Sequence, residues 1–105
     1  MYLRELINEL SQHDPAVVVR QGFDSPHSYR GYYDHLAFEP ATNVSIGSML
    51  AAAEEANGST YQGWKGGDFT MGDWTPCHLA YMGDTGEGLG RTLLRYMLAD
   101  TVEGA

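Results

Sequence analysis

Three segments of the chain place apolar side chains at the spacing of an amphipathic helix, and we expect helices over residues 2–13, 46–57 and 88–99. Asp14-Pro15 stops the first pattern. The expected buried stripes are Leu3, Leu6, Ile7 and Leu10 in the first segment, Ile46, Met49, Leu50 and Ala53 in the second, and Leu89, Leu93, Tyr96 and Met97 in the third.

Residues suited to helix ends flank the second helical segment. Ser45 can act as N-cap, because its hydroxyl can accept a hydrogen bond from an N–H of the first turn. Gly58 suits the position just after the last turn. After the third segment we expect residues 100–105 to form a loose tail.

Short runs with apolar or alternating side chains predict five β-strands. They cover residues 16–21, 30–38, 60–64, 69–71 and 77–82. The unbroken run Val17-Val18-Val19 is typical of a strand buried on both faces.

Turn-forming residues separate these strands. Residues 22–28 contain Asp24-Ser25-Pro26, and we expect a loop there. Pro40 should end the second strand, because proline cannot donate to a sheet. Gly66-Gly67 is the natural turn between the third and fourth strands.

The order of these elements favours an α+β protein, with a small antiparallel β-sheet packed by about three helices. A chain of 105 residues has room for one core of ordinary size, so we expect a single domain over residues 1–105.

The charge balance argues against one class of partner. The formal net charge is −8, and the six cations are five arginines and Lys65. Duplex nucleic acid needs a basic face, so we do not expect it as a partner. Arginine suits bidentate recognition of phosphate or carboxylate, although surface ion pairing with the fourteen acids would explain any single arginine equally well.

Cysteine usage and hydropathy predict that the protein is located in a cytoplasm. Cys77 is the single cysteine, which excludes a disulfide within the chain and a thiol-based zinc site. The start of the chain lacks the basic and apolar regions of a signal peptide, and no apolar run approaches a membrane span of about 18 residues.

Few residues of the chain are candidates for catalysis. They are His27, Asp34, His35 and His78. Asp34 and His35 are neighbours on an expected strand, so their side chains should point to opposite faces. No metal-ligand spacing is present, and structural roles for these residues are favoured over catalytic ones. We therefore expect no enzyme activity, no metal site and no cofactor.

Two groups of basic residues carry the candidate ligand chemistry of the C-terminal half. Arg91 and Arg95 lie four residues apart and should share one side of the last helix, where they could grip phosphates or simply face solvent. They follow the glycine-rich run 83–90, whose Asp84 and Glu87 favour an ordinary acid-capped helix start over an anion site.

The other candidates combine aromatic and basic side chains. Trp64 and Lys65 lie between glycines, where the indole could be an exposed platform for a base or could pack into the core of a hairpin. Arg30 lies among three tyrosines, Tyr32 included, a mixture that suits a nucleotide-like ligand or a protein interface.

Residues 29–40, 63–71 and 86–90 together resemble a family of small proteins from tailed bacteriophages, the type 1 Thoeris anti-defence sponges. Members of that family sequester cyclic ADP-ribose isomers, which bacterial Thoeris systems use as an alarm signal, and do not degrade them. The resemblance implies homo-oligomers, dimers or hexamers, and some members have a second site for cyclic oligonucleotides. This chain is shorter than such members, which puts the second site in doubt.

The resemblance also implies roles for individual residues. Trp64 would stack on the adenine and Arg91 with Arg95 would hold phosphates, with a further arginine supplied by Arg30 or Arg20. The position of the family's base-contacting asparagine has only Asp73 as a candidate here, which would be a departure.

The resemblance therefore predicts a phage protein that acts in the host cytoplasm and binds a small cyclic nucleotide at a subunit interface, with Arg30, Tyr32, Trp64, Lys65, Arg91 and Arg95 at the site. Two other functions stay open. One is an accessory protein that inhibits a host protein by docking on it, and the other is a small nucleotide hydrolase with His35 or His78 as base.

Overall fold

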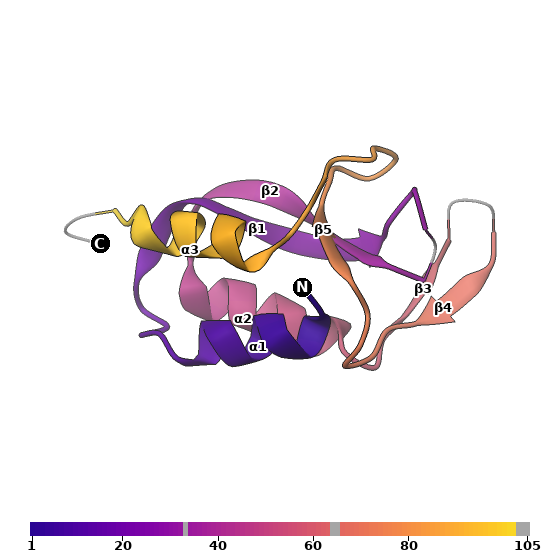
Figure 1. Cartoon of the computed structure of the whole chain (residues 1–105), viewed down its shortest axis with the longest axis horizontal. Coiled ribbons are helices and arrows are strands. Elements are labelled where there is room, and N and C mark those ends of the chain that lie inside the picture. The colour runs from indigo at the N-terminus through magenta and orange to yellow at the C-terminus, as the bar shows by residue number, and fades with distance from the viewer. Residues whose placement is uncertain (33, 64–65, 103–105) are drawn as a thin grey trace.

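The computed structural model describes residues 1–32, 34–63 and 66–102 (Figure 1). The elements along the chain are α1 (Leu3–Ser11), β1 (Val18–Ser28), β2 (Leu36–Ser45), α2 (Ile46–Ala56), β3 (Thr60–Gln62), β4 (Asp68–Thr70), β5 (Cys77–Leu79), β6 (Glu87–Gly88) and α3 (Arg91–Ala99).

Two sheets organise these strands. The larger has the order β1-β2-β5-β6, and the smaller is the β3–β4 hairpin, which lies at the opposite end of the molecule from residue 102 (Figure 1). β1 with β2 and β5 with β6 are antiparallel, whereas β2 and β5 are parallel. The α+β class and the three helices are confirmed, and the sheet is mixed because β5 returns alongside β2 after the α2 and β3–β4 excursion.

The β1–β2 hairpin is longer than the sequence pattern predicts. The expected loop over residues 22–28 is wrong, since these residues continue β1 and pair with β2 as far as Ser28 opposite Leu36. The turn-forming residues do not end the strand. They produce a register shift between Asp24 and Pro26, where Ser25 has a positive φ of 50°.

The expected strand over residues 30–38 is also shifted. Residues 30–32 and 34–35 lie between the two strands, and β2 runs on through Pro40, which pairs with Phe23. β5 pairs only as far as Phe38, so the proline lies where that side of β2 needs no N–H donor.

The helices follow the periodicity closely. Ser45 caps α2 by accepting a hydrogen bond of 3.0 Å from the backbone N–H of Ser48, as expected. α3 begins at Arg91, later than expected, and its buried residues are Leu94, Met97 and Leu98. The inward placement of Tyr96 is wrong, because its side chain is 80% exposed. In the described ranges no helix is both long and apolar enough to cross a membrane.

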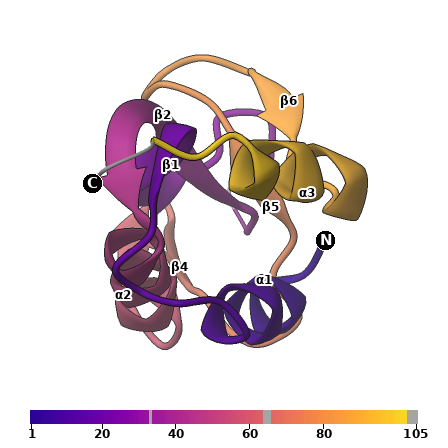
Figure 2. The ribbon, with the colours of Figure 1, turned by 90° about the vertical axis from the view of Figure 1, so that its left-hand side faces the viewer.

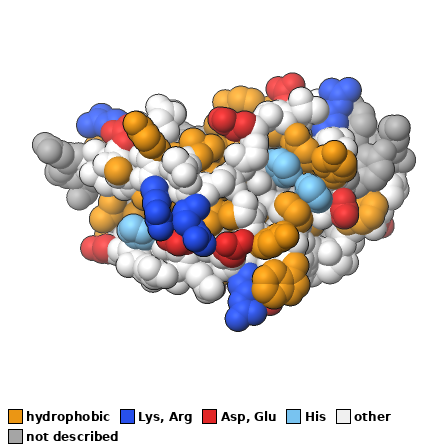
Figure 3. All heavy atoms as spheres, viewed as in Figure 1, with side chains coloured by type: hydrophobic (Ala, Val, Ile, Leu, Met, Phe, Trp, Pro, Cys, Tyr) orange, Lys and Arg blue, Asp and Glu red, His pale blue; other side chains and the backbone are white. Residues whose placement is uncertain are grey.

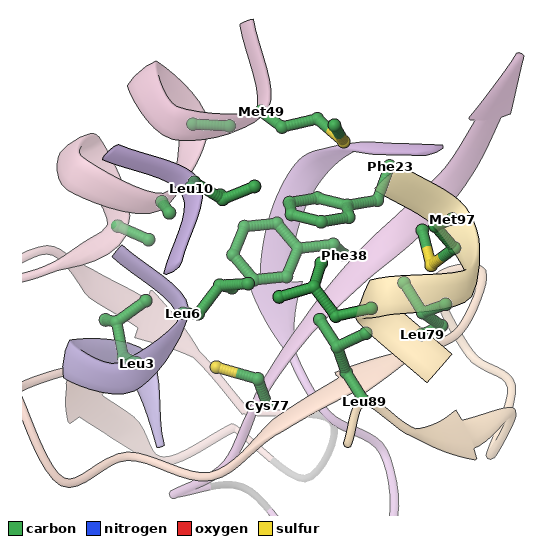
Figure 4. Packing of buried hydrophobic residues seen from close by; sticks show 14 of the residues in the cluster. Leu3, Leu6, Leu10, Phe23, Phe38, Met49, Cys77, Leu79, Leu89 and Met97 are labelled. Atoms are coloured by element: carbon green, nitrogen blue, oxygen red, sulfur yellow. The ribbon is translucent and has the colours of Figure 1, made fainter. Parts of the chain in front are cut away.

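The helices and the long hairpin surround one core. Seen from the end of the molecule, α2 lies below the curved β1–β2 ribbon, α3 lies beside it, and α1 lies below α3 (Figure 2). Phe23 on β1 and Phe38 on β2 place their ring centroids 4.6 Å apart at the centre of this core (Figure 4). Side chains from every helix belong to the same buried cluster as this pair, among them Leu3, Leu6, Leu10, Met49, Leu94 and Met97.

Both ends of the described chain are tied into the fold. The N-terminal ammonium of Met1 donates to the carbonyl of Leu89 at 2.7 Å. At the other end Thr101 forms a bridge with Val19, and the N–H of Val102 donates to Val18. The expectation of a loose tail is therefore wrong for residues 101 and 102, and its last three residues lie outside the described ranges.

The two faces of α3 give a direct test of this packing. Leu94→Ala should lower the free energy of unfolding by about 2–5 kcal/mol, because it leaves a cavity in the core. Tyr96→Ala on the same helix should change it by less than about 0.5 kcal/mol. Urea unfolding followed by circular dichroism measures both, and equal losses would contradict the observed helix orientation.

Candidate functional site

A cleft of about 280 Å³ opens where the β1–β2 connection, the β3–β4 turn and the loop after β5 meet. Its lining residues are His27, Ser28, Arg30, Gln62, Gly63, Gly66, Met82 and Gly83. We call it the Arg30 cleft. Arg30 thus shares a cleft with the glycines that flank Trp64 and Lys65, while the last two lie outside the described residues.

The guanidinium of Arg30 is held at the wall of this cleft. Its Nη1 atom donates to the carbonyl of Gly83 at 2.6 Å. Across the cleft, Gly66 has a φ of +95°, a conformation that favours glycine, and open space surrounds the position where a Cβ would stand. The cleft therefore combines a cationic fork with a turn whose backbone a ligand can approach closely.

His27 forms the floor. Its side chain is 5% exposed, and both ring nitrogens face backbone carbonyls, Nδ1 that of Ser28 at 3.0 Å and Nε2 that of Ala80 at 2.9 Å. A neutral imidazole has one N–H and donates to only one of the two. Through Ala80 the ring joins β1 to the loop that carries Gly83, so it positions the wall that holds Arg30.

A stack of aromatic rings and imidazoles lies beside the cleft. Tyr29 and His78 are parallel at 3.8 Å between ring centroids, and His35 places Nδ1 3.0 Å from Nε2 of His78. Tyr32, 62% exposed, packs on His35 with centroids 4.9 Å apart. The Tyr29 hydroxyl donates to the carbonyl of Thr85. The register of β2 and β5, with Ala37 opposite His78, brings these groups together.

The environment of His78 favours its neutral form. Burial, then the neighbouring His35, then the N-terminal ammonium lower the pKa of His78 to about 4. A neutral ring can share a single N–H with His35, which is the arrangement that the contact of 3.0 Å requires. A group with so low a pKa is a weak proton acceptor, which makes His78 a poor general base near neutral pH.

The described ranges meet neither the needs of a metal site nor those of a reactive thiol. No three His, Cys, Asp or Glu side chains there lie close enough together to hold a metal ion. Burial raises the pKa of the Cys77 thiol to about 12, so it is not a thiolate at neutral pH.

The two arginines of α3 lie elsewhere. Arg91 forms ion pairs with Glu5 at 3.1 Å and Glu9 at 3.5 Å, and so joins α3 to α1. Basic and acidic side chains meet on the face that carries these two helices (Figure 3). Arg95 lines shallow hollows with Tyr96 and Ala99 on the same helix. Neither arginine lines the Arg30 cleft.

Two other sequence candidates also lie apart from the cleft. Arg20 pairs with Asp100 at 3.3 Å, so of the two arginines that the resemblance offered for this role only Arg30 lines the cleft. Asp73 accepts a hydrogen bond of 2.9 Å from the Asn57 amide, next to the end of α2.

Sequence reasoning missed the loop after β5 as a wall of the site. Met82 and Gly83 are distant from Arg30 in sequence, and the contact depends on the pairing of β5 with β2. The glycine-rich run 83–90 was visible in the sequence, but nothing local indicated which part of the molecule it would lie against.

Comparisons with models of protein families, with curated proteins and with solved structures found no match to this chain.

The shifted pKa of His78 predicts a pH dependence of stability. In the unfolded chain the imidazole binds a proton below about pH 6.5, whereas the folded chain binds it only near pH 4. The unfolded state therefore binds more protons between these values, and the free energy of unfolding should fall as pH falls from 6.5 to 4. In urea unfolding at pH 7.5 and 4.5, His78→Gln should show a smaller drop than the wild type.

His13→Gln is the control, because it removes an exposed imidazole next to α1. Its drop should match that of the wild type. A His78→Gln drop as large as the wild-type drop would contradict the low pKa of His78.

Proposed function

We propose that this protein binds a small cyclic nucleotide, such as a cyclic ADP-ribose isomer, and sequesters it without converting it. In a phage context this would remove an immune signal of the host. The observation that carries the proposal is the Arg30 cleft, where a guanidinium and the glycines Gly63 and Gly66 line one hollow.

The chemistry of the cleft suits a phosphorylated, partly aromatic ligand. Arginine offers planar N–H donors that match phosphate oxygens, and Arg30 is fixed in position by Gly83. A rigid donor loses little conformational entropy when a ligand binds. The exposed ring of Tyr32, two residues after Arg30, offers a surface on which a base can stack, and the family resemblance implies the same role for Trp64.

The protonation states of His78 and Cys77 favour binding over hydrolysis. His78 has a lowered pKa and Cys77 a raised one, so both are neutral and poorly reactive near pH 7. A sequestering protein needs affinity and no turnover, which these groups permit.

Under this proposal Arg91 and Arg95 would contribute to the ligand site only in an oligomer. Because they line no part of the Arg30 cleft within one chain, they would reach a ligand there from a second copy. Such an assembly, a dimer or hexamer, would agree with the family resemblance and would bury further apolar surface such as the exposed Tyr96.

A thermal-shift screen of the purified chain against cyclic ADP-ribose isomers and cyclic di- and trinucleotides tests the proposal. A ligand at 100 times its Kd should stabilise the fold by about 2.7 kcal/mol. Arg30→Gln should weaken binding about 10–100-fold, because hydrogen bonds to charged groups contribute about 1.5–3 kcal/mol. Ligand recovered after denaturation should be chemically unchanged by chromatography.

Arg20→Gln is the matched control, since it removes a surface arginine of β1 that pairs with Asp100. It should bind like the wild type. Loss of binding in Arg91→Gln with normal binding in Arg30→Gln would place the ligand on α3 instead. A modified ligand would favour the hydrolase, and no shift with any nucleotide would sink the proposal.

A second function, docking on a protein, is favoured by one exposed patch. Trp74 is 66% exposed, meets Tyr2 edge-on at 5.8 Å, and has the Arg4 guanidinium 5.7 Å from its ring. Tryptophan, tyrosine and arginine are the residues that most often dominate binding energy at protein interfaces.

A further inference from the structure

A second cleft, of about 390 Å³, lies on the other side of the loop after β5. It is bounded by the β1–β2 ribbon, the end of β5, the loop with β6, and α3. Its lining residues are Gln21, Gly22, Pro40, Leu79, Ala80, Tyr81, Asp84, Gly86, Glu87, Leu93 and Met97. We call it the acidic cleft.

Apolar and acidic groups are segregated in this cleft. Leu79, Leu93 and Met97 provide a buried or half-buried apolar floor. Exposed carboxylates of Asp84 and Glu87 lie at the rim, and no lysine or arginine is among the lining residues. Neither carboxylate forms an ion pair with another residue in the described ranges. The cleft therefore presents negative charge beside apolar surface.

The acidic wall is fixed by the backbone. Glu87 pairs with Leu79 in the β5–β6 ladder. Gly86 packs so closely on β5 that an added Cβ would collide with the carbonyl oxygen of Leu79, and its φ of +27° disfavours side chains. The backbone of Glu87 is therefore held beside the end of β5, which contributes Leu79 to the apolar floor.

We propose that the acidic cleft binds a small organic ammonium ion with an apolar or aromatic body. The body would replace water on Leu79, Leu93 and Met97, and the ammonium would lie between the two rim carboxylates. Tyr81, 56% exposed at the same rim, adds an aromatic face that attracts cations.

Size and charge narrow the class of ligand. A volume of about 390 Å³ is near the lower end for small-molecule pockets, so a single ring with a short amine chain fits better than a peptide. Two carboxylates disfavour anions, since the described lining residues include no lysine or arginine. The site is independent of the proposed nucleotide site, since the Arg30 cleft lies across the loop with Met82 and Gly83.

Titration of the full-length ¹⁵N-labelled chain with 2-phenylethylamine, followed by amide NMR spectra, tests this inference. Saturable shifts are expected at Gly22, Gly86 and Leu93, which line the cleft on three elements. The neutral isostere 2-phenylethanol should bind at least threefold more weakly, because it lacks the charge. Asp84→Asn/Glu87→Gln should weaken the amine by about three- to tenfold and leave the alcohol unchanged.

Glu54→Gln/Glu55→Gln is the matched control, since it also removes two negative charges, here from the exposed face of α2. It should bind the amine like the wild type, and the thermal unfolding midpoint verifies that both double variants fold. Equal affinities for amine and alcohol, shifts centred away from the cleft, equal losses in both double variants, or no saturable binding would each overturn the inference.

Discussion

The antiparallel pairing of β1 with β2 is the constraint on which the rest of this structure depends. It places Phe23 and Phe38 together at the centre, and every helix contributes side chains to the core around that pair. β2 also offers the edge along which β5 runs in parallel, and β5 in turn carries β6. The far end of the ribbon supports the Arg30 cleft, and its middle forms one wall of the acidic cleft. Core and candidate sites therefore share one scaffold.

How far the sequence predicts this fold depends on which interactions decide each element. Whether a segment forms a helix depends mainly on residues close together in the sequence. The periodicity therefore located all three helices, and Ser45 was correctly predicted as an N-cap. The ribbon is decided by pairing between distant residues, which overrides the turn signals of residues 22–28 and the proline at position 40. Tyr96 was misplaced because an amphipathic tyrosine satisfies either face of a helix, and burial of Leu94 and Leu98 decided the outcome.

The candidate site was predictable only in part, for the same reason. Arg30 among tyrosines was a recognisable chemical signal, and it does line a cleft. Its wall at Gly83 depends on sheet pairing that no local pattern reveals. The two arginines of α3 had the right spacing for phosphate, but spacing along a helix does not show what lies opposite. Here α1 presents Glu5 and Glu9, and Arg91 pairs with them.

One loop separates two clefts of opposite charge, and polar contacts from the end of the ribbon hold it. His27 reaches Ala80, Tyr29 reaches Thr85, Arg30 reaches Gly83, and Glu39 accepts from the N–H of Met82. Most of this loop is exposed, so these hydrogen bonds rather than apolar burial fix its position. Such contacts contribute about 1 kcal/mol each in net terms, so the loop is held firmly only by their sum. The acidic net charge is thus compatible with an anion site, because the arginine and the carboxylates are kept on opposite sides of one anchored segment.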